Sequence, residues 1–151
     1  MALAVVWAAM LPAAAYAAAL ATDRPAAQLL AFAVYGFGGA ICHQRDERSF
    51  HLFAEQLPVC ARCTGLYAGA AIAAISYVWL ARGRRSGSAS AAGLTSTARR
   101  LLPLAAGPLA ASLLYEWTTG DVPSNVIRAG TGIVLGGAVA YVILAAIDST
   151  G

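Results

Sequence analysis

The chain has 151 residues, of which 60% are hydrophobic and only 11% are charged. A soluble domain carries about 25% charged residues, so this chain cannot cover a water-facing surface, and we expect membrane lipid around it. The net charge of +3 comes from ten basic residues, all of them arginine, against seven acidic ones. No basic stripe lies on a soluble face, so we expect no nucleic acid as a partner.

Five apolar stretches predict an all-α integral membrane bundle of about five transmembrane helices, in a single transmembrane domain over residues 1–151. A membrane-spanning helix needs about 20 residues, with a range of roughly 17–25. The fourth stretch contains two prolines, which are tolerated where neighbouring groups satisfy the freed carbonyls. The predicted spans cover about residues 2–21, 26–41, 61–81, 101–117 and 126–147.

The first stretch is rich in alanine, and its Ala15-Tyr16-Ala17 segment resembles the small-residue cleavage site of a signal peptide. It lacks the basic segment that such a peptide needs at its start. We therefore expect residues 2–21 to be a retained helix.

The segment between the second and third spans is polar but patterned. Phe50, Phe53 and Leu57 recur at i, i+3 and i+7 behind Ser49, a residue type that caps helix starts. This spacing predicts a short interfacial helix that lies over the membrane surface and roofs the polar groups below it.

All three cysteines of the chain lie where the second span ends and the third begins. Cys42 and His43 close the second span, and Cys60-x-x-Cys63 opens the third. Consecutive spans with a short connection are expected to be antiparallel neighbours, so these groups converge. Three thiolates and one imidazole form an established zinc set, with His51 as the spare imidazole. The sequence predicts a zinc site with Cys42, His43, Cys60 and Cys63 as ligands.

Two other interpretations of the cysteines stay open. One is a quinone-linked membrane thiol-disulfide oxidoreductase, with Cys60 and Cys63 as the redox pair, Cys42 as the exchanging thiol and a quinone as cofactor. Membrane proteins of the vitamin K epoxide reductase and disulfide-bond-formation type have a similar layout. The other is a non-enzymatic metal sensor or carrier. An odd number of cysteines argues against a purely structural disulfide.

Residues 82–100 predict both a flexible loop and the orientation of the chain. Glycine, serine and alanine fill the middle of this loop, and five arginines bracket it. Cytoplasmic loops carry the excess of basic residues, so the loop should be cytoplasmic in a multi-pass inner-membrane protein. Alternation then places the cysteine segment, residues 42–60, and the turn at 118–125 on the extracytoplasmic side.

Further polar residues reach the same face from the last two spans. Glu116 ends the fourth span, and Asn125 and Arg128 open the fifth. Ionisable groups at membrane depth are costly and are therefore candidates for function. We expect Glu116, Arg62 and Arg128 in catalytic roles and Arg48 and Asn125 in substrate binding. An open zinc position would act on an anionic or lipid-like substrate that the arginines hold, but whether the protein is an enzyme is left open.

Small residues occur in every span, and two pairs have the small-xxx-small spacing. These pairs are Gly65-x-x-x-Gly69 and Gly132-x-x-x-Gly136. Such residues let helix backbones approach closely. They predict a tight bundle and a homo-oligomer that forms through glycine-rich helix faces.

These motifs together resemble the signature of a prokaryotic family of small predicted membrane proteins, catalogued as a domain of unknown function. The similarity runs from about Tyr35 to Gly137 and implies no activity. Glu116 takes a position where members more often carry Asp. The matching motifs are Cys42-His43, Arg48-Ser49-Phe50, Pro58-x-Cys60-x-Arg62-Cys63-x-Gly65-x-Tyr67 and Ser124-Asn125-x-x-Arg128-x-x-Thr131-Gly132. The resemblance implies that the cysteines, His43, Glu116, Asn125 and the three arginines belong to one site.

Overall fold

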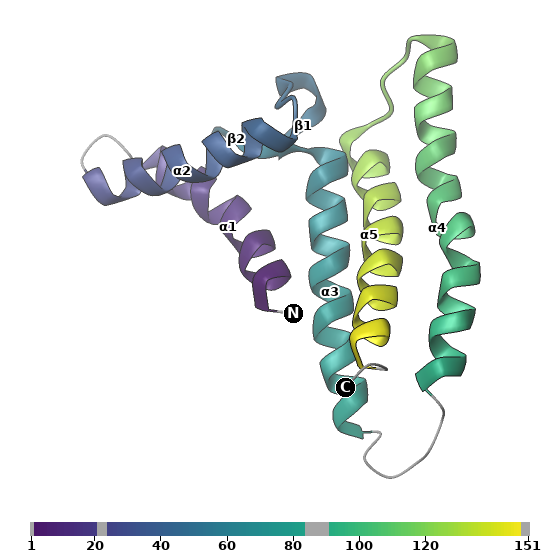
Figure 1. Ribbon diagram of the computed structural model, residues 1–151. Coiled ribbons are helices and arrows are strands. Elements are labelled where there is room, and N and C mark those ends of the chain that lie inside the picture. The colour runs from purple at the N-terminus through teal and green to yellow at the C-terminus, as the bar shows by residue number, and fades with distance from the viewer. Residues whose placement is uncertain (1, 21–23, 84–90, 149–151) are drawn as a thin grey trace.

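The computed structural model describes residues 2–20, 24–83 and 91–148, and it confirms the predicted all-α membrane fold. The described part contains five α-helices, one short 3₁₀ helix and one two-stranded hairpin (Figure 1). In chain order the elements are α1 (Ala2–Ala19), α2 (Pro25–Ile41), η1 (Asp46–Arg48), β1 (Ser49–Leu52), β2 (Glu55–Cys60), α3 (Ala61–Gly83), α4 (Ala91–Thr119) and α5 (Asn125–Asp148).

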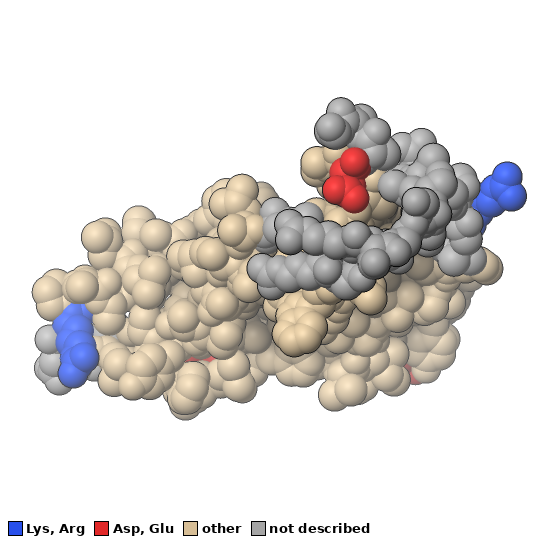
Figure 2. Space-filling model, turned by 90° about the horizontal axis from the view of Figure 1, so that it is seen from below, with Lys and Arg blue, Asp and Glu red and all other residues tan. Residues whose placement is uncertain are grey.

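The outer surface of the bundle is apolar, as a membrane protein requires. Within the described residues, α1, α5 and the Ala61–Leu80 part of α3 are long and apolar enough to cross a membrane. Their large side chains point outward: Leu3, Trp79 and Val126 are 85%, 73% and 73% exposed. Figure 2 shows one face on which uncharged residues dominate and basic side chains appear at the edges. A soluble protein rarely exposes so much contiguous apolar surface.

Helices α3, α4 and α5 run alongside one another, with α5 packed between the other two (Figure 1). Helix α1 packs against α3 and against the hairpin. The predicted second span is a helix, but α2 runs across the direction of α3–α5 and contacts α1 and β2. Its 17 residues reach only about 26 Å, less than the roughly 30 Å of a bilayer core. The expected antiparallel pairing of the second and third spans was therefore wrong, because α5 is the main neighbour of α3.

The expected loop at residues 82–100 is helical at both ends. Helix α3 continues to Gly83 and α4 begins at Ala91, so only the part between them is left for a connection. Residues 84–90 lie outside the described residues.

The predicted interfacial helix was wrong, because its residues form an antiparallel hairpin. Strand β1 pairs with β2, and the tight turn between them places Phe53 and Ala54 at positive φ angles of 58° and 63°. The hairpin buries Leu57 and Val59 of β2, with Val59 packed on Leu11 of α1. Pairing between the strands satisfies the backbone of this segment while β2 packs its apolar residues against α1.

Glycines form the contact between α3 and α5. A Cβ atom at Gly65 would lie 2.0 Å from the carbonyl oxygen of Ala129, and one at Gly136 would lie 2.0 Å from that of Leu66. Gly69 and Gly132 face the opposite helix almost as closely, with the corresponding distances at 2.2 and 2.3 Å. The predicted close packing is confirmed within one chain. These glycine faces are covered by the neighbouring helix of the same chain, so they no longer support a homo-oligomer. The homo-oligomer itself stays a prediction.

We expect the substitution Gly136→Ala to destabilise the protein by about 1–3 kcal/mol, because its methyl group would overlap the backbone of α3. Gly130→Ala on the same helix is the matched control, since no atom lies within 4 Å of the added carbon. Alanine favours a helix over glycine, so the control should be as stable as the unmodified protein or slightly more stable. Titration with a denaturing detergent, followed by circular dichroism, measures both. Equal stability of the two variants would contradict the close helix contact.

Candidate functional site

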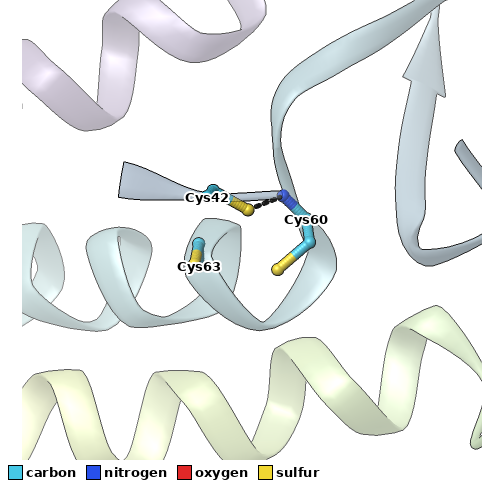
Figure 3. Close-up of side chains that lie close together, drawn as sticks. All are labelled: Cys42, Cys60 and Cys63. Atoms are coloured by element: carbon cyan, nitrogen blue, oxygen red, sulfur yellow. Dashed lines mark hydrogen bonds between the residues drawn. The ribbon is translucent and has the colours of Figure 1, made fainter. Parts of the chain in front are cut away.

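Three segments bring the three cysteines together. Cys42 directly follows α2, Cys60 ends β2, and Cys63 lies in the first turn of α3. Their sulfur atoms all lie within 4.8 Å of one another. Figure 3 shows the three side chains around a common space, with the backbone N–H of Cys60 donating to the sulfur of Cys42 over 3.2 Å. We call these three residues the cysteine cluster.

A glutamine that the sequence did not single out holds the segment after α2 against the hairpin. The Gln44 side chain donates to the backbone oxygens of Pro58, over 2.6 Å, and Tyr35, over 2.8 Å. Gln56 donates in return to the backbone oxygen of Gln44 over 2.8 Å. These bonds fix Cys42 beside the end of β2. Glutamine gives no spacing signal in the sequence, so only the folded structure identifies this role.

The sulfur atoms of the cluster influence each other's ionisation. The Cys63 thiol hydrogen-bonds to Cys60 and, against the opposing effect of burial, lowers the pKa of Cys60 to about 5. The backbone N–H of Cys63 and the side chain of Cys42 act in the same direction. A thiolate is the form that binds metals and attacks disulfides, so this residue is ready for either chemistry at neutral pH.

Neither histidine joins the cysteine cluster. Cys42 has an extended backbone (φ −144°, ψ 141°), and successive side chains of an extended segment point to opposite sides. His43 is accordingly exposed, and among the described residues the group with metal-binding geometry contains the three cysteines alone. His51 is exposed and pairs with Asp46 over 2.8 Å. The structure thus brings together three of the four predicted ligands.

Beside the cysteines, one carboxylate binds three guanidinium groups. Glu116 of α4 contacts Arg48 of η1 at 2.8 Å, Arg62 of α3 at 2.7 Å and Arg128 of α5 at 3.2 Å. The expected pair between Glu116 and Arg128 is present, and the other two arginines join it. Arg62 also donates to the hydroxyl of Ser112 over 3.0 Å, a partner that the sequence did not indicate. We call the three arginines with Glu116 the arginine cluster.

This cluster is buried at the end of the bundle. Glu116 is 8% exposed and Arg128 only 2%. The desolvation cost of a buried charge is several kcal/mol and must be offset by contacts with opposite charges and hydrogen bonds. Glu116 supplies such contacts to three cations at once, so it holds η1, α3 and α5 to α4.

The structure gives Asn125 a positioning role. Its amide nitrogen donates to the backbone oxygen of Ser49 over 2.9 Å and so ties the start of α5 to the hairpin. Ser124 accepts from the backbone N–H of Ile127 over 3.4 Å and caps the helix. The substrate-binding role expected of Asn125 stays a prediction.

A pocket of about 310 Å³ connects the two clusters. Its wall contains Cys42, Cys60, Cys63, His43, Arg45, Arg48, Arg62 and Arg128. Sulfur ligands and basic donors therefore face one space at the end of the bundle. Such an arrangement can hold a soft metal ion and an anion side by side.

Comparisons with known proteins agree with the membrane assignment. A family described as "Predicted membrane protein (DUF2085)" matches residues 42–142, which include both clusters. An uncharacterized protein of Methanocaldococcus jannaschii is 36% identical over 53 residues, or 35% of this chain and 34% of that protein. An uncharacterized protein of Methanothermobacter thermautotrophicus is 53% identical over 30 residues, 20% of this chain and 27% of that protein. The chain thus spans about a third or less of the curated relatives it matches, and no solved structure matches it.

We expect Glu116→Gln to cost about 3–5 kcal/mol of stability, because the amide leaves three guanidinium groups without their shared negative charge. Asp121→Asn removes the same charge from an exposed position and should change stability by less than about 0.5 kcal/mol. Detergent-induced unfolding of both variants provides the measurement. If Glu116→Gln unfolds at the same detergent fraction as the control, Glu116 does not hold the helices together.

Proposed function

The chain belongs to the DUF2085 family of predicted membrane proteins, and we propose that it binds zinc through the thiolates of Cys42, Cys60 and Cys63. The observation that carries the proposal is the mutual approach of the three sulfurs within 4.8 Å. In a tetrahedral site with zinc–sulfur distances of about 2.3 Å, the sulfurs lie about 3.8 Å apart. Only a small inward movement separates the observed arrangement from that geometry.

The charges around the cluster support three thiolates with a metal ion. Three thiolates and one divalent cation sum to a single negative charge. Arg62 and Arg128 line the same pocket and carry more positive charge than Glu116 neutralises. This excess of positive charge beside the cluster would offset the negative charge of a zinc ion with three thiolates.

Three protein ligands leave one coordination position of zinc for another group. Structural zinc sites are closed by four protein ligands, whereas catalytic sites have three and keep a position for water or substrate. Here that position would face the pocket that the arginines line. Zinc lowers the pKa of bound water and polarises a bound oxygen, so hydrolysis of an anionic or lipid-like substrate at the membrane surface is the activity that this site fits best.

The roles of the charged residues follow from their places. Arg48, Arg62 and Arg128 line the pocket and would hold the anionic part of the substrate. Glu116 lies behind them, bound to all three, and acts by positioning them. His43 lines the pocket outside the sulfur group, where it would serve the substrate or a water molecule.

We place the site on the extracytoplasmic face of the cell membrane. The cysteines lie at the N-terminal end of α3, and the arginine-bracketed connection to α4 follows its other end. Basic loops stay in the cytoplasm, so the cysteines would face the opposite compartment.

A thiol-disulfide oxidoreductase is the second candidate. The same sulfur distances favour it, because a small movement would also allow Cys60 or Cys42 to form a disulfide with Cys63. The two electrons and two protons released by that bond would need an acceptor such as a membrane quinone. A metal sensor or carrier without catalysis would use the same three ligands as the zinc enzyme.

Purified protein should contain about one zinc per chain and three thiols that titrate without reductant after the metal is removed. Separate Cys42→Ser, Cys60→Ser and Cys63→Ser variants should lose most of this zinc. His43→Ala should retain it, like the matched control His51→Ala, since neither imidazole joins the sulfurs. Elemental analysis and thiol titration give both values. Metal-free protein with two thiols in a reducible disulfide would reject zinc and favour the redox function.

The orientation is testable with a membrane-impermeant maleimide on whole cells. We expect the native cysteines to react from outside once a chelator has removed the metal. A control protein with all three cysteines changed to serine and with Ser88→Cys should react only after lysis, because residue 88 lies in the predicted cytoplasmic connection. The reverse pattern would place the site in the cytoplasm.

A further inference from the structure

The arginine cluster contains buried donors that Glu116 does not use. Nε of Arg62, and Nε and Nη1 of Arg128, are buried and make no hydrogen bond within the described part of the chain. Nε of Arg48 is likewise without a hydrogen bond and lies 3.7 Å from the carboxylate of Glu47. A buried donor without an acceptor is costly, and more so when the group is charged. Nε of Arg62 and the two nitrogens of Arg128 therefore lack an acceptor that another molecule would have to supply, whereas Nε of Arg48 faces Glu47.

The charges of the cluster lead to the same conclusion. Three guanidinium groups share the carboxylate of Glu116, and Arg48 also lies 3.7 Å from the exposed carboxylate of Glu47, so three positive charges less two negative charges leave an excess of one. Arg128 is 2% exposed, so water screens this excess poorly. An anion in the pocket would supply the negative charge that the cluster lacks.

The pocket presents this charge to a ligand. Arg48, Arg62 and Arg128 line it together with the three cysteines. Its volume of about 310 Å³ lies at the lower end of the range of ligand pockets, roughly 300–1,000 Å³. It would therefore enclose a small charged group, while the remainder of a larger molecule stays outside.

We propose that this pocket binds a phosphate group, held by Arg48, Arg62 and Arg128 next to the cysteine cluster. The proposal deepens the zinc function by naming the substrate class, yet the arginine donors exist whether or not metal is bound. Arg48, Arg62 and Arg128 come from three different elements and line the same space, so they could donate to several oxygens of one phosphate, a group that arginine binds through two parallel hydrogen bonds.

The phosphate could belong to a lipid head group or to a soluble phosphate compound, and the two sources share this chemistry. Zinc-loaded protein in a maltoside detergent, which carries no phosphate, should be titrated with inorganic phosphate by calorimetry. A second arm compares samples with and without added phosphatidic acid, because occupation by this lipid would block the calorimetric signal of inorganic phosphate. If phosphatidic acid blocks the binding of inorganic phosphate, the natural ligand is a lipid head group. If phosphate binding is unchanged, the natural ligand is a soluble phosphate compound.

Arg128→Gln and Arg48→Gln should each weaken phosphate binding at least about tenfold, since each removes a charge-assisted donor. Arg24→Gln is the matched control, because this exposed arginine at the start of α2 is not part of the pocket. Arg48 is the less buried of the two pocket residues, so its variant tests the proposal if Arg128→Gln does not fold. Zinc content and the unfolding midpoint confirm that each variant is intact.

The two proposals fail in different ways. Folded, zinc-loaded protein that binds neither inorganic phosphate nor phosphatidic acid would overturn the phosphate site and leave the zinc site standing. Equal affinity of phosphate for Arg48→Gln and the unmodified protein, or equal competition by acetate, would also overturn it. Arginine-dependent phosphate binding by a protein without zinc would support the phosphate site and reject the metal.

Discussion

The carboxylate of Glu116 is the contact on which the site depends. It lies near the end of α4, is almost fully buried, and binds guanidinium groups from η1, α3 and α5. Glu116 and Arg128 would not be tolerated alone at this depth, because each buried ion loses several kcal/mol of hydration, whereas the Arg48 side chain is 30% exposed. The contacts of 2.7–3.2 Å offset that cost only when all four segments are in place. Formation of the cluster and assembly of this end of the bundle are therefore one event.

The glycines between α3 and α5 make this convergence possible. Gly132 meets the backbone oxygen of Arg62, where an added Cβ atom would lie only 2.3 Å away. The close contact between α3 and α5 therefore extends to the helical turns that carry Arg62 and Arg128. The two arginine side chains start from neighbouring stretches of backbone. Since guanidinium groups repel one another, a carboxylate from the third helix is needed between them. Apolar packing fixes the helices, and Glu116 then determines where the arginines point.

The sequence predicted the features that depend on the order of the apolar helices along the chain. It did not predict the features that depend on tertiary contacts. The ends of α1, α2, α3 and α5 agree closely with the apolar stretches, whereas α4 begins ten residues before the predicted span. The sequence also correctly brought Cys42, Cys60, Cys63 and the Glu116–Arg128 pair to one end. The hairpin was not predicted, because apolar residues spaced three and four positions apart in a short segment fit both a helix and two strands joined by a tight turn. Its turn has no glycine, and its stability comes from packing on α1, which no local pattern reveals. The displacement of His43 follows from the extended backbone at its neighbour.

The two clusters belong to one site because one short segment contributes to both. Arg62 lies between Cys60, the last residue of β2, and Cys63, in the first turn of α3. Arg62 reaches across to Glu116 and Ser112 on α4. Glu116 in turn links Arg62 to Arg128 and Arg48. Glu116 balances only one of three positive charges, and what remains is available to thiolates and to an anion in the pocket that both clusters line. The positive charge that Glu116 leaves unbalanced is the feature on which the proposed zinc site and the proposed phosphate site both depend.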